Sequence, residues 1–268
     1  MDDIIRTQLD KHTIAAQATF FRTIAKGTFE IMPNWVRGVS GVQIPTFNIY
    51  MPLNPASLTD ELLADTAAFF FSKNLVYAIE LIHDQIPHGP NYLHQRGYQP
   101  LPPQPAMYLT HLPPNPPPNP RVKIERVHTV PNHTAFYTTL HAVFDFDLAD
   151  VMKLFPILHL NRSYYPTIRH YLAFIDEQPA AAGTIICKDG AVSVYNLCTL
   201  DPYRRQGIAT LLLHTMLQEA QRDEFNLSMV YATPQAYHLL TQFGFKIYAQ
   251  RQWFLPPGLD YGDAETGD

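Results

Sequence analysis

Residues 199–213 read TLDPYRRQGIATLLL, and this stretch sets the expected fold. The apolar residues before it predict a strand that ends at Leu200, and Gly207 opens a segment with apolar residues at helical spacing. A tight connection with two arginines therefore joins a strand to a helix N-terminus. The unpaired N–H groups of a first helical turn carry a partial positive charge of about +0.5. Such a connection is suited to hold a pyrophosphate.

This connection matches neither of the two common nucleotide-binding motifs. It has no G-K-[ST] and no G-x-G-x-x-G, which excludes a Walker loop and a dinucleotide fingerprint. Gly207 allows a ligand to approach the backbone closely, and Ala209 is small for the same reason. The alternative interpretation is an ordinary strand–turn–helix with two solvated arginines.

The C-terminal half alternates strand and helix patterns around this connection. Its order predicts an α/β fold of mixed, α+β-like character, with a central mixed, mostly antiparallel sheet and helices on both faces. The helices are expected from Pro131 and over Leu148–Leu158, Gly207–Arg222 and Pro234–Phe243. The strands are expected over Val122–Val130, Arg169–Glu177, Ala180–Gly190, Ala191–Leu200, Asn226–Ala232 and Phe245–Leu255.

Proline marks the expected division of the chain. It is concentrated between Pro100 and Pro120, a run that predicts an extended polyproline spacer and excludes a helix or a central strand. A ligand for an SH3- or WW-type domain is the other interpretation, but only Arg121 supplies a basic flank. We expect one lobe over residues 1–112, a linker over 113–120, a second lobe over 121–256 and an acidic tail over 257–268.

The N-terminal half repeats part of the C-terminal pattern. NLVYAIEL echoes NLSMVYAT, and NYLHQRGYQ shares an L-x-Q-x-G-aromatic core with HLLTQFGFK. We interpret this as a diverged internal repeat, with coincidence as the alternative. The stretch equivalent to residues 199–213 is Met51–Leu63, which is acidic and has neither arginine nor glycine. An anion would be repelled there, so we expect this lobe to bind no phosphate group and to act as a structural partner that shapes a cleft beside the C-terminal lobe.

Composition excludes several classes of protein. Lys and Arg number 19 and Asp and Glu number 24, so that the formal charge of −5 argues against a nucleic-acid binder. Two cysteines, Cys187 and Cys198, cannot form a disulfide framework and are typical of a reducing compartment. The N-terminus lacks a leader pattern, and no apolar run approaches the ~20 residues of a membrane span. We expect a cytoplasmic protein with no membrane or nucleic-acid partner.

The hexapeptide RRQGIA (Arg204–Ala209) fits the signature [Q/R]-x-x-G-x-[G/A] between a strand and an apolar helix. Over about Val122–Leu255 the sequence resembles the GNAT superfamily of N-acetyltransferases. The resemblance implies acetyl-CoA as cosubstrate, its pyrophosphate on the amides of Arg205–Thr210 and its pantetheine arm along Cys198–Leu200, where two central strands splay apart. The expected cosubstrate-binding residues are Cys198, Thr199, Leu200, Arg204, Arg205, Gln206, Gly207, Ile208, Ala209, Thr210 and Thr233.

The resemblance also implies direct attack of an amine on the thioester, with a backbone N–H of the Cys198 strand near the oxyanion. Family members often carry a tyrosine four residues before the Gly-Phe pair, but Leu240 stands in that position. Tyr237 lies three residues earlier and could substitute as the acid. Tyr195 and Asn196 are the other catalytic candidates; as neighbours in a strand they are expected to face opposite sides of the sheet.

Cys198 could be a nucleophile with His214 or His238, but a small buried thiol is the commoner state. The histidines show no metal-ligand spacing, and no metal is expected. The whole predicts a tandem GNAT-like N-acetyltransferase that acts on an amine of a small molecule or peptide. Its rivals are a non-catalytic acyl-CoA-binding or scaffold protein and an enzyme that transfers a longer acyl group.

Overall fold

The computed structural model describes residues 2–24, 26–156 and 166–259. The chain divides into two compact units, each built from two separate stretches of sequence. Unit 1 comprises Met1–Gly27 and Pro105–Tyr248, and unit 2 comprises Thr28–Gln104 and Ala249–Asp268.

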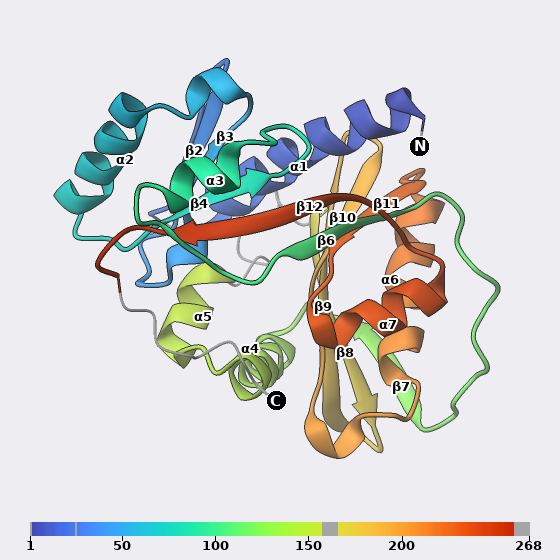
Figure 1. The fold of residues 1–268 in the computed structure, drawn as a ribbon. Helices are drawn as coiled ribbons and strands as arrows, with labels where there is room; N and C mark the ends of the chain where they lie inside the picture. Colours follow the sequence, from blue (N-terminus) through green and yellow to red (C-terminus); the bar gives the residue numbers. More distant parts are fainter. Residues whose placement is uncertain (1, 25, 157–165, 260–268) are drawn as a thin grey trace. The chain divides into compact units, whose positions relative to one another are not determined.

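Unit 1 contains a mixed sheet with the strand order β6-β11-β10-β9-β8-β7 (Figure 1). Strands β10 and β11 are parallel, and the other neighbours pair antiparallel. The strands are β6 (Gln104–Leu109), β7 (Val122–Arg126), β8 (Ile168–Ile175), β9 (Gln178–Lys188), β10 (Ala191–Thr199) and β11 (Leu227–Tyr231). The helices are α1 (Asp3–Thr23), α4 (Val130–Phe144), α5 (Leu148–Leu154), α6 (Ile208–Arg222) and α7 (Pro234–Phe243).

Helices cover both faces of this sheet, as the sequence predicts. On β9, Ile185 belongs to the apolar core that includes Leu212 of α6 and Leu240 of α7. The next residue, Ile186, packs on the opposite face against Ala16 of α1. Adjacent strand residues point to opposite faces, so α6 and α7 form one layer and α1 lies in the other.

Unit 2 repeats part of the topology of unit 1. Its sheet has the order β1-β2-β3-β4-β12, with β3 and β4 parallel and the other neighbours antiparallel. A short strand β5 (Gln99–Pro100) also pairs with β12. The elements are β1 (Thr28–Ile31), β2 (Trp35–Val39), β3 (Asn48–Pro52), α2 (Asp60–Ser72), β4 (Ala78–Ile82), α3 (Gly89–His94) and the part of β12 (Lys246–Leu255) that follows Tyr248.

Apart from the two-residue strand β5, the order strand–helix–strand–helix–strand is therefore the same in β3-α2-β4-α3-β6 and in β10-α6-β11-α7-β12. In each series the first two strands are parallel neighbours, which agrees with the predicted internal repeat. The last strand of each series, however, pairs in the other unit: β6 lies beside β11, and β12 lies beside β4. Each sheet is thus completed by a strand from the other half of the sequence.

This exchange changes the expected division of the chain. The predicted lobes, residues 1–112 and 121–256, do not coincide with the compact units, because α1 and β6 belong with the C-terminal sheet. The expectation that Pro100–Pro120 contains no strand is wrong for Gln104–Leu109, which pairs with β11. Pro105 is tolerated near the start of that strand, where the loss of one N–H donor costs least.

The proline-rich run is a connection within unit 1 and does not join the two units. It leads from β6 to β7 and contains no helix or strand from Leu112 to Asn119. The Nε2 of His214 donates to the carbonyl of Pro113 at 3.1 Å, and Gln218 donates to Asn115 at 3.3 Å. These two hydrogen bonds hold the proline-rich run against α6.

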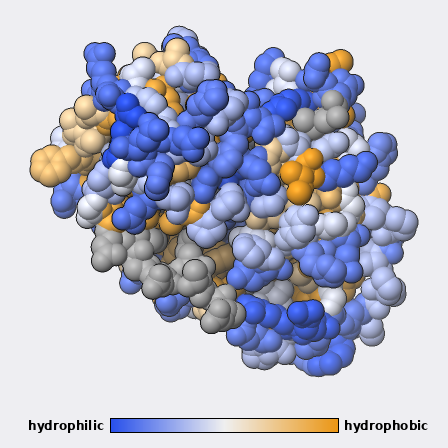
Figure 2. Space-filling model, in the orientation of Figure 1, coloured by the Kyte–Doolittle hydropathy of each residue, from blue (hydrophilic) through white to orange (hydrophobic). Residues whose placement is uncertain are grey.

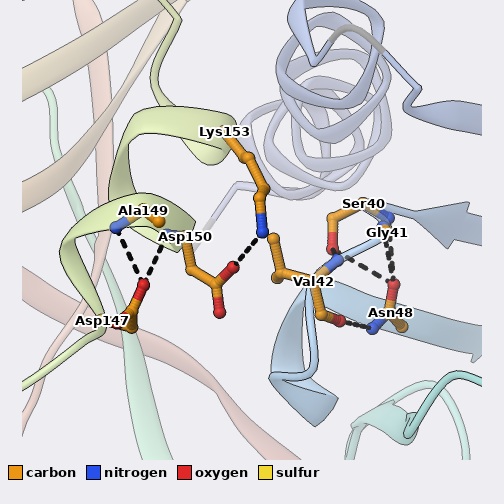
Figure 3. A network of polar contacts seen from close by, with 8 residues as sticks. All are labelled: Ser40, Gly41, Val42, Asn48, Asp147, Ala149, Asp150 and Lys153. Carbon is orange, nitrogen blue, oxygen red and sulfur yellow. Dashed lines mark hydrogen bonds and ion pairs between the residues drawn. The ribbon is translucent and has the colours of Figure 1, made fainter.

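Two local clusters of polar contacts are drawn in Figure 3, one from each unit. In unit 1, Asp147 caps α5 by accepting from the amides of Ala149 and Asp150, and Lys153 pairs with Asp150 at 2.7 Å. In unit 2, the buried Asn48 accepts from the Ser40 amide at 3.0 Å and donates to the Val42 carbonyl at 2.7 Å, which closes the loop between β2 and β3.

Hydrophilic residues cover most of the described surface on the face drawn in Figure 2, and hydrophobic residues lie between them in scattered patches. Among the described helices, none combines the length and the apolar character that crossing a membrane requires. The helix predicted over Leu148–Leu158 ends at Leu154, so the prediction is too long at residues 155 and 156, and residues 157 and 158 lie outside the described residues.

Candidate functional site

The parallel strands at the centre of unit 1 separate partway along their length. Pairing of β10 with β11 runs from Ala191 opposite Leu227 to Val194 opposite Val230. Strand β10 continues beyond this point to Thr199, still paired with β9. One edge of β10 is therefore left without its parallel neighbour, in agreement with the splay that the resemblance implies.

A bulge shapes this open edge. The register of β10 on β9 shifts between Tyr195 and Cys198, and Asn196 adopts a left-handed backbone conformation with φ of 54°. Beyond the bulge, the Leu200 amide donates to the Ala180 carbonyl on the β9 side at 2.9 Å. Because amides alternate along an antiparallel ladder, those of Leu197 and Thr199 point toward the open edge.

The connection from β10 to α6 is tightly folded. A 3₁₀ turn covers Asp201–Tyr203, after which Arg205 and Gly207 take left-handed conformations with φ of 60° and 75°. Arg204 is held in place by Asp201 at 2.8 Å and by the Thr199 carbonyl at 3.2 Å. Arg205 is exposed, and the structure describes no ion pair for it. Its guanidinium is therefore available to a ligand.

The N-terminus of α6 presents its amides without a side-chain cap. Gly207 is the N-cap residue, and the first turn of the helix carries no acidic residue. Within the described part of the chain, the amides of Gln206–Thr210 have no hydrogen-bond acceptor. A Cβ placed on Gly207 would meet nothing within 4 Å, so the space beside it is open. The arrangement is a concave, positively polarised site for an anion.

The equivalent helix of unit 2 begins differently. The Thr59 side chain caps α2 by accepting from the Leu62 amide at 3.3 Å, and Asp60 and Glu61 occupy its first turn. A hydrogen bond from Arg96 lowers the pKa of Asp60, which keeps this carboxylate ionised. An anion is repelled there, so of these two equivalent helix N-termini the one of α6 has the chemistry of a phosphate site.

Acetyl-CoA fits the residues of unit 1 on two further observations. The Thr199 hydroxyl is buried and has no hydrogen-bond partner among the described residues. Leu197 packs toward the core under α6, and Thr199 lies on the same face because it is two residues further along the strand. A polar, extended ligand along this edge of β10 would find free amides and a free hydroxyl.

The residues predicted for proton transfer are spread over two elements. Tyr237 lies on α7 with 40% of its surface exposed, whereas Leu240, which stands in the usual tyrosine position, is fully buried. Thr233 is the N-cap of α7 and accepts from the Ala236 amide at 3.3 Å. Its hydroxyl therefore has a structural partner already.

Tyr195 and Asn196 share one face of the sheet, so the expectation that they face opposite sides is wrong. Tyr195 is the cross-strand partner of Thr184 and packs against the α1 side. The Asn196 side chain donates from Nδ2 to Thr184 Oγ1 at 3.2 Å. The left-handed backbone of Asn196 breaks the strand alternation and turns its side chain to the face of Tyr195.

Cys198 has the environment of a structural thiol. It is 7% exposed, and burial raises its pKa to about 12. The thiolate, which is the nucleophilic form, is therefore not populated near neutral pH. Among the described residues, no group of three or more His, Cys, Asp or Glu side chains is arranged to hold a metal ion.

Sequence reasoning missed two buried histidines on the α1 face of the sheet. His12 of α1 donates from Nδ1 to the Lys188 carbonyl at 2.9 Å, and its Nε2 accepts from Ser193 at 2.8 Å. His170 of β8 contacts Thr184 through Nδ1 at 2.9 Å. Burial lowers the pKa of His12 to about 4 and that of His170 to about 3, so both are neutral at pH 7. No local sequence pattern marks either residue.

Comparison with known proteins shows which family model and which solved structures the chain resembles. Residues 159–254 match a family model described as an acetyltransferase (GNAT) domain. None of the curated proteins compared with the chain matches its sequence.

Solved structures with a similar fold include a GCN5-related N-acetyltransferase from Kribbella flavida, with a TM-score of 0.71 and 16% identity over 93% of this chain and 96% of that one. A GCN5-related N-acetyltransferase from Sphaerobacter thermophilus has a TM-score of 0.63 and 12% identity over 88% and 85%. A tandem GNAT protein from the clavulanic acid biosynthesis pathway has a TM-score of 0.58 and 12% identity over 82% and 77%. The chain thus has the GNAT fold, and residues 159–254 resemble the GNAT domain model.

Proposed function

We propose that unit 1 binds acetyl-CoA and transfers its acetyl group to an amine of a small molecule or peptide. The observation that supports this proposal is the uncapped, acid-free N-terminus of α6 beside the gap between β10 and β11. The pyrophosphate would accept hydrogen bonds from the amides of Gln206–Thr210, with Arg205 supplying a compensating charge.

The pantetheine arm would lie along the open edge of β10. It can pair with the amides of Leu197 and Thr199 as an added strand does, and the free Thr199 hydroxyl supplies one more polar group. Arg204 acts indirectly, because its bonds to Asp201 and the Thr199 carbonyl hold the connection in shape.

The proposed reaction is direct transfer. The neutral amine attacks the thioester carbonyl, a C–N bond forms, the C–S bond breaks, and the amine proton passes to solvent. An amide of the open edge of β10 stabilises the oxyanion, and the departing thiolate takes up a proton. We propose Tyr237 as the acid and Asn196, with Tyr195 beside it, as the polar groups that meet the amine.

A non-catalytic acyl-CoA-binding protein is the second candidate, and the burial of Leu240 in the usual tyrosine position favours it. The two functions are separated by incubating the full chain with acetyl-CoA and tyramine, spermidine, glucosamine or alanine amide, and by measuring released thiol. Amine-dependent release supports the transferase. Tight calorimetric binding of acetyl-CoA, with no thiol released in the presence of any of these amines, supports the binding protein. Faster thiol release from longer acyl-CoA substrates supports an enzyme that transfers a larger acyl group.

A further inference from the structure

A chain of hydrogen bonds leads from the buried interior of unit 1 to the bulge at the open edge of β10. Asn196 Nδ2 donates to Thr184 Oγ1 at 3.2 Å, and Thr184 Oγ1 is 2.9 Å from His170 Nδ1. Thr184 is 2% exposed and His170 is 4% exposed, whereas Asn196 is only half-buried. These hydrogen bonds therefore connect two buried side chains, Thr184 and His170, to Asn196, which reaches the open edge of β10.

Asn196 donates the first of these bonds, and the second depends on the tautomer of His170. Thr184 Oγ1 accepts the amide hydrogen of Asn196, and its own hydrogen needs an acceptor because the group is buried. His170 Nδ1 can accept it in the tautomer that carries the ring proton on Nε2, for which no described residue is a partner. Burial lowers the pKa of this histidine to about 3 and leaves the ring neutral. The ring of Phe136 packs at a tilt against His170, with ring centroids 4.6 Å apart, and holds the imidazole in turn.

The bond to Thr184 sets the orientation of the Asn196 side-chain amide. With Nδ2 committed to Thr184, the carbonyl oxygen Oδ1 remains, and no described residue donates to it. An amide oxygen accepts hydrogen bonds only, so its natural partner is an N–H or O–H group. The left-handed backbone of Asn196, a conformation that asparagine adopts more readily than most residues, lies at a bulge next to the proposed thioester position.

We propose that Asn196 Oδ1 accepts a hydrogen bond from the N–H of the acceptor amine and orients the nitrogen lone pair toward the thioester, with Thr184 and His170 as positioning residues. The inference rests on the proposed transferase function. It places the amine on the α1 and α4 side of the sheet, which is the side opposite α6. The two substrates would then approach β10 from opposite faces, so neither blocks the other.

The test is designed around the backbone of Asn196. Glycine tolerates φ of 54° without strain, so Asn196→Gly removes the amide side chain and preserves the bulge. We expect unchanged thermal stability, unchanged calorimetric affinity for acetyl-CoA and a fall of about tenfold or more in kcat/KM for the amine. Thr184→Val should produce a similar fall, Thr184→Ser should restore most of the rate, and the double variant Asn196→Gly/Thr184→Val should lose little more than either alone.

The outcomes separate this inference from the function on which it rests. If Asn196→Gly acetylates the amine at the wild-type rate, the inference is wrong and the proposed transferase function is unaffected. Additive losses in the double variant also overturn it, because the two residues would then act independently. A wild-type chain that binds acetyl-CoA and acetylates none of tyramine, spermidine, glucosamine and alanine amide overturns the transferase function and this inference with it.

Discussion

Val194 and Val230 are the last paired residues of β10 and β11, although β10 continues to Thr199. The gap that opens after this pair lies on the same strand that leads into the amide-rich connection at Arg204–Gly207. Strand separation and an uncapped helix N-terminus thus occur in succession along one short stretch of chain. This succession is the structural basis for proposing an acetyl-CoA site in unit 1.

Gly207 is predicted to matter for binding more than for folding. Its left-handed φ of 75° makes Gly207→Ala cost about 1 kcal/mol of unfolding free energy. Gly41 has φ of 82° and equally open space around a Cβ, so Gly41→Ala is a matched control in unit 2. We expect similar losses in urea melts but a weaker acetyl-CoA affinity only in Gly207→Ala. Equal affinities of the two variants would contradict the role of Gly207.

Tyr237→Phe tests the proposed acid. The exposed hydroxyl of Tyr237 lies on α7, one turn before Leu240. Its removal should lower turnover about tenfold or more, with little change in the KM for acetyl-CoA. Tyr108→Phe removes a half-buried hydroxyl from β6 and serves as the control. A Tyr237→Phe variant as fast as the wild type in steady-state thiol release would remove Tyr237 from the mechanism.

His12 predicts a pH-dependent stability. Its folded pKa of about 4 lies below the ordinary value of 6.5, so the unfolded chain binds the extra proton between these values. The contribution of His12 to the unfolding free energy should therefore be full above about pH 6.5, and the unfolding free energy should fall as the pH is lowered toward 4. The contribution of one histidine to this slope is at most ~1.4 kcal/mol per pH unit.

Urea melts between pH 4 and 7 measure that slope. His12→Gln should be less stable at pH 7 and should show a shallower pH dependence. Ser193→Ala removes the hydrogen bond to Nε2 but keeps the titrating ring, so it should retain the wild-type slope. Parallel curves for the wild type and His12→Gln would show that His12 does not cause the pH dependence.

The exchange of β6 and β12 predicts that the C-terminal half cannot fold alone. A fragment over residues 110–268 lacks β6 and α1, which leaves one edge of β11 unpaired and one face of β9 uncovered. We expect insoluble protein from this fragment and soluble protein when it is co-expressed with residues 1–109. The exchange would be contradicted if the fragment alone were monomeric in gel filtration, unfolded cooperatively and bound acetyl-CoA.

The elements around the helix N-terminus were predictable because their signals are local. Apolar spacing gave α6 within one residue, and the bounds of α7 agree with the predicted Pro234–Phe243. The strands β8 to β11 also lie close to their predicted ranges, since each is a buried run bounded by turn residues.

The features missed by sequence reasoning depend on distant contacts. Helix α1 buries polar residues such as His12, Thr13 and Gln17, so its sequence carries no apolar stripe. The partner of β6 lies far along the chain in β11, and no local pattern encodes that choice. The shared face of Tyr195 and Asn196 follows from a bulge, which alternation cannot predict.

The most direct measurement is a calorimetric titration of the full chain with acetyl-CoA, in the wild type, Arg205→Glu and Arg222→Glu. Both variants reverse one charge on an exposed arginine, but Arg222 lies in the last turn of α6 and Arg205 just before its first. We predict about tenfold or greater loss of affinity for Arg205→Glu, near wild-type affinity for Arg222→Glu, and weaker wild-type binding at high salt. Equal affinity in all three proteins would contradict a pyrophosphate site at the N-terminus of α6.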